Sequence, residues 1–445
     1  MTQDKTKNIE LNIREIIDLF QGGSAEKALV KSENLIKREK EVPFLLNLNG
    51  IINIHLNNWD KAIISLNKAI SLNEKYVEAY NNLGIAYNNL GNLEDAIKNF
   101  SISVKIKNDY SNGYNNLGSI YDDLGKNEDA IENYSKALEF NPKHIEAQKN
   151  LIHILTYYTP TKKNLNSIIL TNAGLRKLGN NFNFKDNIKK IDLSTLFKSS
   201  NKIIQENIKE LTFFESQIYR RNNVDLNCNR HHKVFNEFNI IPKFCFSCFK
   251  IQIEPKNVLE LFKLFLIFDS LKLPKNNTRK CLVELRPNIS GVYKGLIYCS
   301  SMEEVNEILK DITPILKEVV DKKIKIIIRR GCSEFADKHE DYKEINKDAL
   351  DFMKYKNEWH EKEKIIDINE AKNKKIKKVF TDSISGLSIS DVLVMNNWLN
   401  YAKEIKDVTY NDISEEIFYS DYISKTILPQ LERRKKELSQ LQLLI

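Results

Sequence analysis

The sequence predicts an α+β chain: an all-α array of repeated helix pairs, then an α+β domain with trailing helices. A 34-residue period runs through the N-terminal third. Further along, four short segments read as strands and two longer ones as helices, in the order βαββαβ. We divide the chain into a repeat array at 10–155, a helical connector at 156–223, an α+β domain at 224–340 and C-terminal helices at 341–445.

The period is clearest in two consecutive copies. The motif YNNLGxxY spans 80–87 and recurs at 114–121. Its glycines, Gly84 and Gly118, let two antiparallel helices approach closely, and the aromatic rings of Phe100 and Tyr134 fill the gaps. Fainter copies precede and follow these two. Since one helix pair cannot bury its own apolar face, the pairs are expected to stack into a superhelix with a concave groove.

This pattern resembles the tetratricopeptide repeat (TPR) family over about residues 10–155. The resemblance implies a groove that holds extended or helical peptides from a protein partner and does no chemistry itself. Asn82, Asn116 and Asn150 recur every 34 residues, and the resemblance suggests that they face the groove. A carboxamide can both donate to and accept from a peptide backbone. The alternative is that asparagine is simply abundant in this chain, and Leu48 interrupts the row one repeat earlier.

The connector contains one amphipathic pattern. Apolar residues at helical spacing predict a helix over 199–221 that packs between domains. Nothing in the connector indicates chemistry.

The strands and helices of the α+β domain are predicted from the spacing of its apolar residues. Strands are predicted at 249–254, 280–286, 292–299 and 324–329, with helices at 255–271 and at 302–321, where Ser301 begins a capping box. This is the ferredoxin-like split arrangement. Connection rules predict an antiparallel sheet of order 4-1-3-2, counting these four strands.

All six cysteines lie between Cys228 and Cys332, a window of 105 residues. Taking strands one and three to run the same way, we expect four of them at one border of the sheet and Cys299 at the opposite border. The expected quartet is Cys245, Cys248, Cys281 and Cys332. Cys228, His231 and His232 lie just upstream and are additional candidates.

A thiolate quartet of this kind suits zinc or an iron–sulfur cluster, since soft ligands prefer those metals. Three other interpretations stay open. The cysteines are inert buried thiols, or one of them is a redox or nucleophilic thiol, or the adjacent histidines are merely exposed. Disulfides are disfavoured by the cytoplasmic location that we infer from the lack of a secretory signal in the first 25 residues.

Two arginines stand next to the last cysteine. Arg329 and Arg330 could cradle a phosphate or a carboxylate and lower the pKa of Cys332, which makes these three residues candidates for catalysis. The alternative is a solvated strand end. An RNA-binding role is disfavoured because Glu254 and Glu284 place carboxylates on the exposed sheet face, where they would repel phosphates.

The sequence after Cys332 predicts charged helices. A segment at 341–366 is expected to cover one sheet face, and helices are expected at 384–405 and 413–444. Pro429 should kink or divide the last helix, and the basic run 433–436 is placed on its outer surface.

Two functions remain for a chain of net charge +8 with no apolar run near the ~20 residues that a bilayer demands. One is a scaffold or adaptor that binds a protein or peptide in its groove and carries a cysteine-rich metal domain. The other is an enzyme whose C-terminal domain uses a metal or a reactive cysteine on a substrate presented by the groove. The common nucleotide-binding and hydrolase signatures do not occur.

Overall fold

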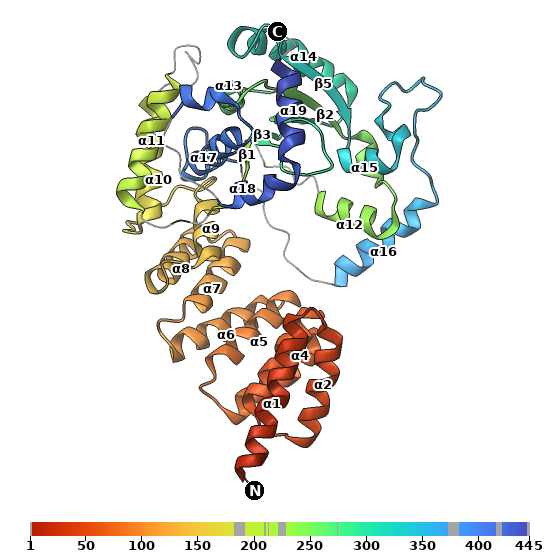
Figure 1. The fold of residues 1–445 in the computed structure, drawn as a ribbon. Coiled ribbons are helices and arrows are strands. Elements are labelled where there is room, and N and C mark those ends of the chain that lie inside the picture. Colours follow the sequence, from red (N-terminus) through yellow and green to blue (C-terminus); the bar gives the residue numbers. More distant parts are fainter. Residues whose placement is uncertain are drawn as a thin grey trace. The chain divides into compact units, whose positions relative to one another are not determined.

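A computed structural model describes residues 2–181, 192–208, 211, 213–220, 228–273, 275–372, 382–414 and 421–442. The chain divides into two compact units (Figure 1). The first is formed by residues up to Leu151, and the second by most of the residues from Ile152 onward. Among the described residues, no helix is both long and apolar enough to span a membrane.

The first unit is a stack of antiparallel helix pairs. Its helices are α1 (Thr2–Gln21), α2 (Ala25–Arg38), α3 (Pro43–His55), α4 (Trp59–Leu72), α5 (Val77–Asn89), α6 (Leu93–Ile106), α7 (Ser111–Asp123), α8 (Asn127–Phe140) and α9 (Ile145–Ile154). A residue with positive φ follows the first helix of each pair: Gly23, Asn57, Gly91 and Gly125. Three are glycines, which reach this conformation without strain, and Asn57 replaces the glycine in the second pair.

Glycines on the first helices lie against bulky side chains of their partner helices. A Cβ atom added to Gly84 would stand 2.6 Å from the Phe100 ring, and one added to Gly118 would stand 2.7 Å from the Tyr134 ring. The predicted close approach of the two helices is therefore present in both central pairs.

The second unit is built around a five-stranded antiparallel sheet. Its strands are β1 (Gln217–Arg220), β2 (Phe249–Glu254), β3 (Arg279–Val283), β4 (Tyr293–Cys299) and β5 (Lys325–Arg330), in the order β1-β3-β4-β2-β5. The four predicted strands are β2 to β5, and their predicted neighbours match this order. β1 is an additional edge strand that the sequence did not predict.

The predicted helix over 199–221 is wrong. α11 (Leu193–Asn207) ends earlier, and Gln217–Arg220 pair with β3 instead. Of the apolar residues that suggested one continuous helix, Ile203 and Ile204 lie in α11 and Ile218 lies in β1. Ile218 is buried in the sheet, where it pairs with Cys281.

Helices cover the sheet and surround it. α13 (Val258–Ser270) follows β2, and α14 (Met302–Val319) follows β4. α13 packs closely on the sheet, because a Cβ atom on Gly295 would collide with the side chain of Leu264 in that helix. The remaining helices are α10 (Ser167–Asn181), α12 (Cys228–Phe238), α15 (Ser333–Lys338), α16 (Trp359–Lys372), α17 (Ile389–Glu404), α18 (Asp421–Ile427) and α19 (Leu431–Gln442).

A buried ion network ties β1 to two helices. Arg220 donates to Asp269 of α13 and, through both terminal nitrogens, to Asp391 of α17 at 3.0 Å. All three side chains are buried. Such a pair is costly to break, since removing one partner leaves an uncompensated buried charge.

Two expectations for the C-terminal region need correction. The charged helices expected in this region do not fill residues 341–366: a short 3₁₀ turn at Glu340–Lys343 precedes an irregular segment, and α16 begins only at Trp359. The basic run at 433–436 does not lie wholly outside, because Arg434 is fully buried. Its guanidinium donates to the backbone oxygens of Gly291 and Arg286. As expected, the chain is interrupted near Pro429, where a 3₁₀ turn at Leu428–Gln430 separates α18 from α19.

Candidate functional sites

The asparagine row of the first unit links successive helix pairs. The side-chain nitrogens of Asn82, Asn116 and Asn150 donate to the side-chain oxygens of Asn47, Asn81 and Asn115, at 2.9, 2.8 and 3.1 Å. Each bond joins the first helix of one pair to the first helix of the pair before it. The donors are half-buried and the acceptors are buried.

The accepting row was missed by the sequence analysis. Asn47, Asn81 and Asn115 also recur every 34 residues, and two of them directly precede a residue of the predicted row. The repeated Asn-Asn dipeptide is the signal that could have revealed it. One asparagine of each dipeptide receives a bond from the next repeat, and the other gives a bond to the previous one.

The donating carboxamides keep unused hydrogen-bonding capacity. Among the described residues, nothing donates to the side-chain oxygens of Asn82, Asn116 and Asn150, and each nitrogen gives only one of its two hydrogens. The repeat-to-repeat bonds therefore fix the orientation of three amides at regular intervals while leaving each one able to bind a ligand.

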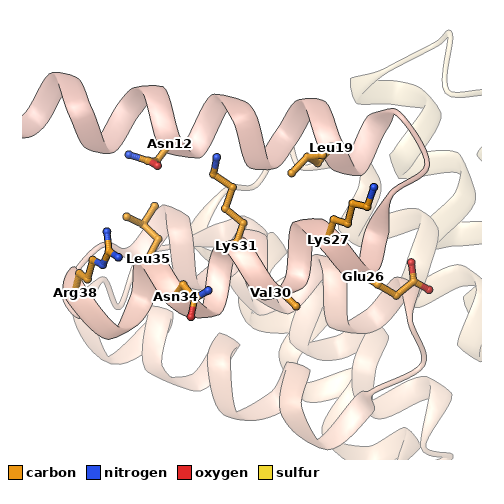
Figure 2. A pocket seen from close by; sticks show the side chains of 9 residues that line it. All are labelled: Asn12, Leu19, Glu26, Lys27, Val30, Lys31, Asn34, Leu35 and Arg38. Carbon is orange, nitrogen blue, oxygen red and sulfur yellow. The ribbon is translucent and has the colours of Figure 1, made fainter.

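A second feature of the first unit is a hollow of about 560 Å³ beside α1 and α2. Figure 2 shows Lys27 and Lys31 of α2 pointing toward α1, which carries Asn12 and Leu19. Lys31 pairs with Glu15 of α1. This hollow lies outside the asparagine rows and was not predicted from the sequence.

In the second unit, the structure does not bring the predicted cysteine quartet together. Cys281 pairs with Gly295, which in turn pairs with Ile253, four residues into β2. At the usual rise per residue that is about 13 Å from the start of the strand. Cys281 is buried there, and burial raises the pKa of its thiol. Its surroundings are those of a core residue.

Cys299 lies at the border where we did not expect it. It pairs with Phe249, the first residue of β2, and therefore ends β4 close to Cys248. Our assumption about strand direction was wrong: β2 and β4 are antiparallel, and so are β3 and β4, so the first and second predicted strands run the same way. Cys248 and Cys299 line one cavity of about 280 Å³. Burial raises the pKa of Cys248 to about 11 and that of Cys299 to about 12.

Cys332 has the most polar environment among these thiols. The ammonium nitrogen of Lys250 donates to its sulfur at 3.6 Å, and the imidazole of His232 hydrogen-bonds to it. Burial would raise the pKa of Cys332, but Lys250 and His232 outweigh that effect and hold it below the ordinary value. The bond to Cys332 raises the pKa of His232 in return. This is a microenvironment that favours a thiolate.

Lys250 was missed as a site residue. It lies on β2, two positions after Cys248, and its place in an alternating strand is typical of a side chain that faces solvent. Its register partners are Tyr298 and Arg329. The ammonium stands 5.2 Å from the centre of the Tyr298 ring.

The other upstream candidates have separate roles. His231 is buried and stacks on Phe244 with ring centres 5.2 Å apart. Cys245 is buried in an apolar cluster with Phe335 and Trp359, and burial raises the pKa of its thiol. Cys228 is half-buried at the start of α12.

One group of side chains in the described part of the chain has the geometry to hold a metal ion. The ligand atoms of His232, Cys332 and Glu334 all lie within 4.8 Å of one another. Glu334 also receives a hydrogen bond from Arg286, and this guanidinium holds the pKa of Glu334 low against the effect of burial. The set therefore has one imidazole, one thiol and one carboxylate.

The two candidate arginines occupy different environments. Arg330 is buried, with its guanidinium 4.3 Å from the centre of the Phe352 ring, and donates to the backbone oxygens of Phe246 and Met353. Arg329, the preceding residue of β5, is half-buried. The contacts of Arg330 are thus structural and do not involve the sulfur of Cys332.

Comparisons with known proteins concern the repeats. A family profile described as "TPR repeat" matches residues 54–91, and two described as "Tetratricopeptide repeat" match residues 77–110 and 111–144. Comparison with curated proteins gives no match.

Three of the similar solved structures illustrate the likeness. MamA from Desulfovibrio magneticus RS-1 is 23% identical, with 33% of this chain and 82% of that chain covered and a TM-score of 0.30. A thermophilic TPR protein from Thermus thermophilus is 20% identical, with coverage of 33% and 80% and a TM-score of 0.31. The first TPR of Spaghetti, bound to an HSP90 peptide, is 24% identical, with coverage of 25% and 89% and a TM-score of 0.24. The helix pairs spanning residues 54–144 of this chain belong to the tetratricopeptide repeat family.

Proposed function

We propose that the chain is a TPR scaffold that grips an extended peptide segment of a protein partner through its asparagine row. The observation that carries this proposal is the pre-orientation of Asn82, Asn116 and Asn150 by bonds to the preceding repeats. Each amide retains an acceptor and a donor hydrogen, which are the groups needed to bind a peptide bond. Binding of this kind is tolerant of the peptide's side chains.

The test begins with peptides selected from a random display library against the full chain. Fluorescence anisotropy of a selected peptide would then compare wild type with Asn82→Ala and Asn116→Ala. We expect each variant to weaken binding about fivefold, since a net hydrogen bond is worth about 1 kcal/mol. Asn88→Ala is the matched control, because Asn88 lies on α5 and its side chain makes no hydrogen bond among the described residues.

Backbone recognition has a second, independent readout. N-methylation of the peptide's amides should weaken binding more than alanine substitution of its side chains. Affinity that is unaffected by both asparagine substitutions, or that depends on peptide side chains alone, would contradict the proposal.

For the second unit we propose a zinc site at His232, Cys332 and Glu334, in a domain whose strands β2 to β5 and helices α13 and α14 form a ferredoxin-like βαββαβ unit. The ligand set supports zinc, which takes imidazole, thiolate and carboxylate ligands and in catalytic sites leaves a fourth position open. An iron–sulfur cluster usually requires four thiolates, and this set supplies one. The positive charge of Lys250 disfavours a bound metal ion, because its ammonium nitrogen lies 3.6 Å from the Cys332 sulfur.

Metal analysis of the full chain after dialysis against zinc tests this site. His232→Ala and Cys332→Ala should each abolish stoichiometric zinc, whereas Cys281→Ala should retain it. Loss of zinc only on substitution of Cys245 or Cys248 would contradict the three-residue site. A chain that binds no zinc but is alkylated rapidly at Cys332 would instead support the enzyme alternative, in which Cys332 is a nucleophile acting on a substrate presented by the repeats.

A further inference from the structure

Arg329 is a partly buried cation whose side chain has no hydrogen-bonding or ionic partner among the residues that the structure describes. Among the described residues its guanidinium makes neither a hydrogen bond nor an ion pair, and its Nε atom is buried. The next residue, Arg330, donates twice to backbone oxygens. Leaving a buried donor unsatisfied is costly, and more so when the group is charged. The position of Arg329 is therefore explained best if something outside the protein accepts its hydrogen bonds.

A cavity of about 130 Å³ adjoins Arg329. It is formed by a turn, by strands β4 and β5, and by segments that follow them, and the side chains that bear on its chemistry are Ser290, Lys294, Arg329, Ser333, Lys343 and Arg433. The hydroxyls of Ser290 and Ser333 have no hydrogen-bond partner within the described part of the chain. An engineered cavity of about 150 Å³ holds a benzene ring, so this one admits a small ion of about five heavy atoms.

The cavity lining carries an excess of positive charge. Four of its lining side chains are cationic, and Asp337 is the one acidic group among them. Three of the cations have carboxylate partners that do not line the cavity: Lys294 pairs with Glu284 at 2.8 Å, Arg433 with Glu437 at 3.6 Å and Lys343 with Glu340 at 3.7 Å. Arg329 is the lining cation that lacks such a partner within the described residues.

The charge of Arg329 also affects the pKa of the neighbouring Lys294. Burial lowers the pKa of Lys294, Glu284 counteracts this, and the charges of Arg286 and Arg329 lower it again. Arg433 also has a buried Nε atom without a hydrogen bond, although one of its terminal nitrogens donates to the Ile289 oxygen at 3.1 Å. Two guanidiniums at the cavity therefore have a buried Nε–H group that makes no hydrogen bond within the described part of the chain.

We propose that this cavity binds a phosphate group. A tetrahedral anion would neutralise the charge of Arg329 and accept from donors that surround it on several sides. Arginine suits this role, since its planar fork of N–H groups matches the oxygens of a phosphate. The ligand is inorganic phosphate or the phosphate group of a small phosphomonoester, because the volume leaves no room for a larger group inside the cavity.

Isothermal titration of the full chain with inorganic phosphate tests the proposal, with sodium chloride and sodium acetate as anion controls at matched ionic strength. We expect phosphate to bind and the controls not to. Arg329→Met should weaken phosphate binding at least tenfold, and Arg329→Lys should retain part of it. Lys325→Met is the matched control, because Lys325 is a cation on the same strand that is already paired with Glu254 at 2.8 Å, and it should change the affinity less than twofold.

A parallel titration with glycerol phosphate distinguishes inorganic phosphate from a phosphomonoester as the ligand. Binding of the ester as tight as that of phosphate indicates a cavity open to a phosphomonoester, and weaker binding indicates free phosphate. Thermal unfolding with and without phosphate checks that the variants fold, since a bound ligand raises the melting temperature by mass action. Phosphate binding no tighter than chloride binding, or unchanged in a folded Arg329→Met variant, would overturn the proposal.

Discussion

The ammonium of Lys250 lies 3.6 Å from the sulfur of Cys332, and the described residues offer no carboxylate hydrogen-bonded to that ammonium. The charge of Lys250 is therefore directed at the thiol. This contact gives Cys332 a chemical character that separates it from the five other cysteines.

Replacing Lys250 by methionine should make Cys332 less reactive in chelator-treated protein. Loss of the ammonium removes an effect that lowers the pKa of the thiol, so the thiolate fraction at neutral pH should fall, by about tenfold if the pKa rises by one unit. Rates of iodoacetamide modification at Cys332, measured by mass spectrometry from pH 5 to 10, should show the midpoint moving to higher pH. Lys280→Met, at a lysine bonded to Gln217 on the same sheet face, should leave the profile in place. An unchanged rate in Lys250→Met would be inconsistent with this account.

Glu284 should contribute to the free energy of unfolding at neutral pH and lose this contribution in acid. Burial would raise its pKa, but Arg286 and Lys294 hold it at about 2, below the ordinary 4.5. Because the folded-state pKa is depressed, the contribution is fully present above about pH 4.5 and is lost as the pH falls toward 2. Glu284→Gln should cost about 1–3 kcal/mol at pH 7 and flatten the stability profile between pH 5 and 2. Denaturant titrations at each pH measure this, with exposed Glu307→Gln as the control; a slope that survives in Glu284→Gln would refute the assignment.

Asn81 should stabilise the junction between two repeats. Its substitution by alanine removes the acceptor for Asn116 and should lower the free energy of unfolding by about 1 kcal/mol. Thermal unfolding of the full chain compares this variant with Asn88→Ala on the same helix, which should be close to wild type. Equal stability of the two variants would mean that the asparagine bonds contribute nothing to the stability of the stack.

Adding a side-chain atom at Gly84 should destabilise the helix pair. Gly84→Ala gains helix propensity, yet its Cβ atom would stand 2.6 Å from the Phe100 ring, so the helices must separate. We expect a net loss of about 1–2 kcal/mol. Gly174→Ala, in a helix where the nearest atom is a methyl carbon of Ile203 at 3.3 Å, should change stability far less. Circular dichroism melts distinguish these outcomes, and a Gly84→Ala chain as stable as wild type would show that the pair tolerates a wider spacing.

Arg434 should be essential for the order of the turn at residues 286–291. Arg434→Met removes a buried guanidinium that donates to the backbone oxygens of Gly291 and Arg286 and should cost about 2–4 kcal/mol. Hydrogen exchange of residues 286–291 should accelerate, whereas Lys436→Met, at an exposed position of the same helix, should leave it unchanged. Protection retained in Arg434→Met would contradict this role.

The features that depend on local periodicity were predictable from the sequence. The 34-residue spacing of Gly84 and Gly118 located the helix pairs because each pair repeats the same local packing. Strand neighbours were also predicted, since connection rules restrict them. Strand direction was not, and this error placed Cys281 at the border in place of Cys299.

The features of the second unit that were missed depend on contacts between residues that are distant in sequence. β1 has only four residues, and its pairing partner lies about sixty residues later, so no local pattern marks it. Lys250 contacts a sulfur 82 positions further along. Arg434 looked like part of an exposed basic run, and only its contacts with a turn more than 140 residues earlier show that it is buried.

The bond from Arg434 to Gly291 has a consequence for biosynthesis. A ribosome makes the chain from the N-terminus, and each helix pair of the repeats can settle on the one before it as it emerges. The sheet cannot reach its final state in this way, because a donor on which its turn depends is translated 143 residues after the acceptor. Completion of the second unit must therefore await the emergence of α19 from the exit tunnel, and during that interval its half-assembled strands would be the segment most in need of a chaperone.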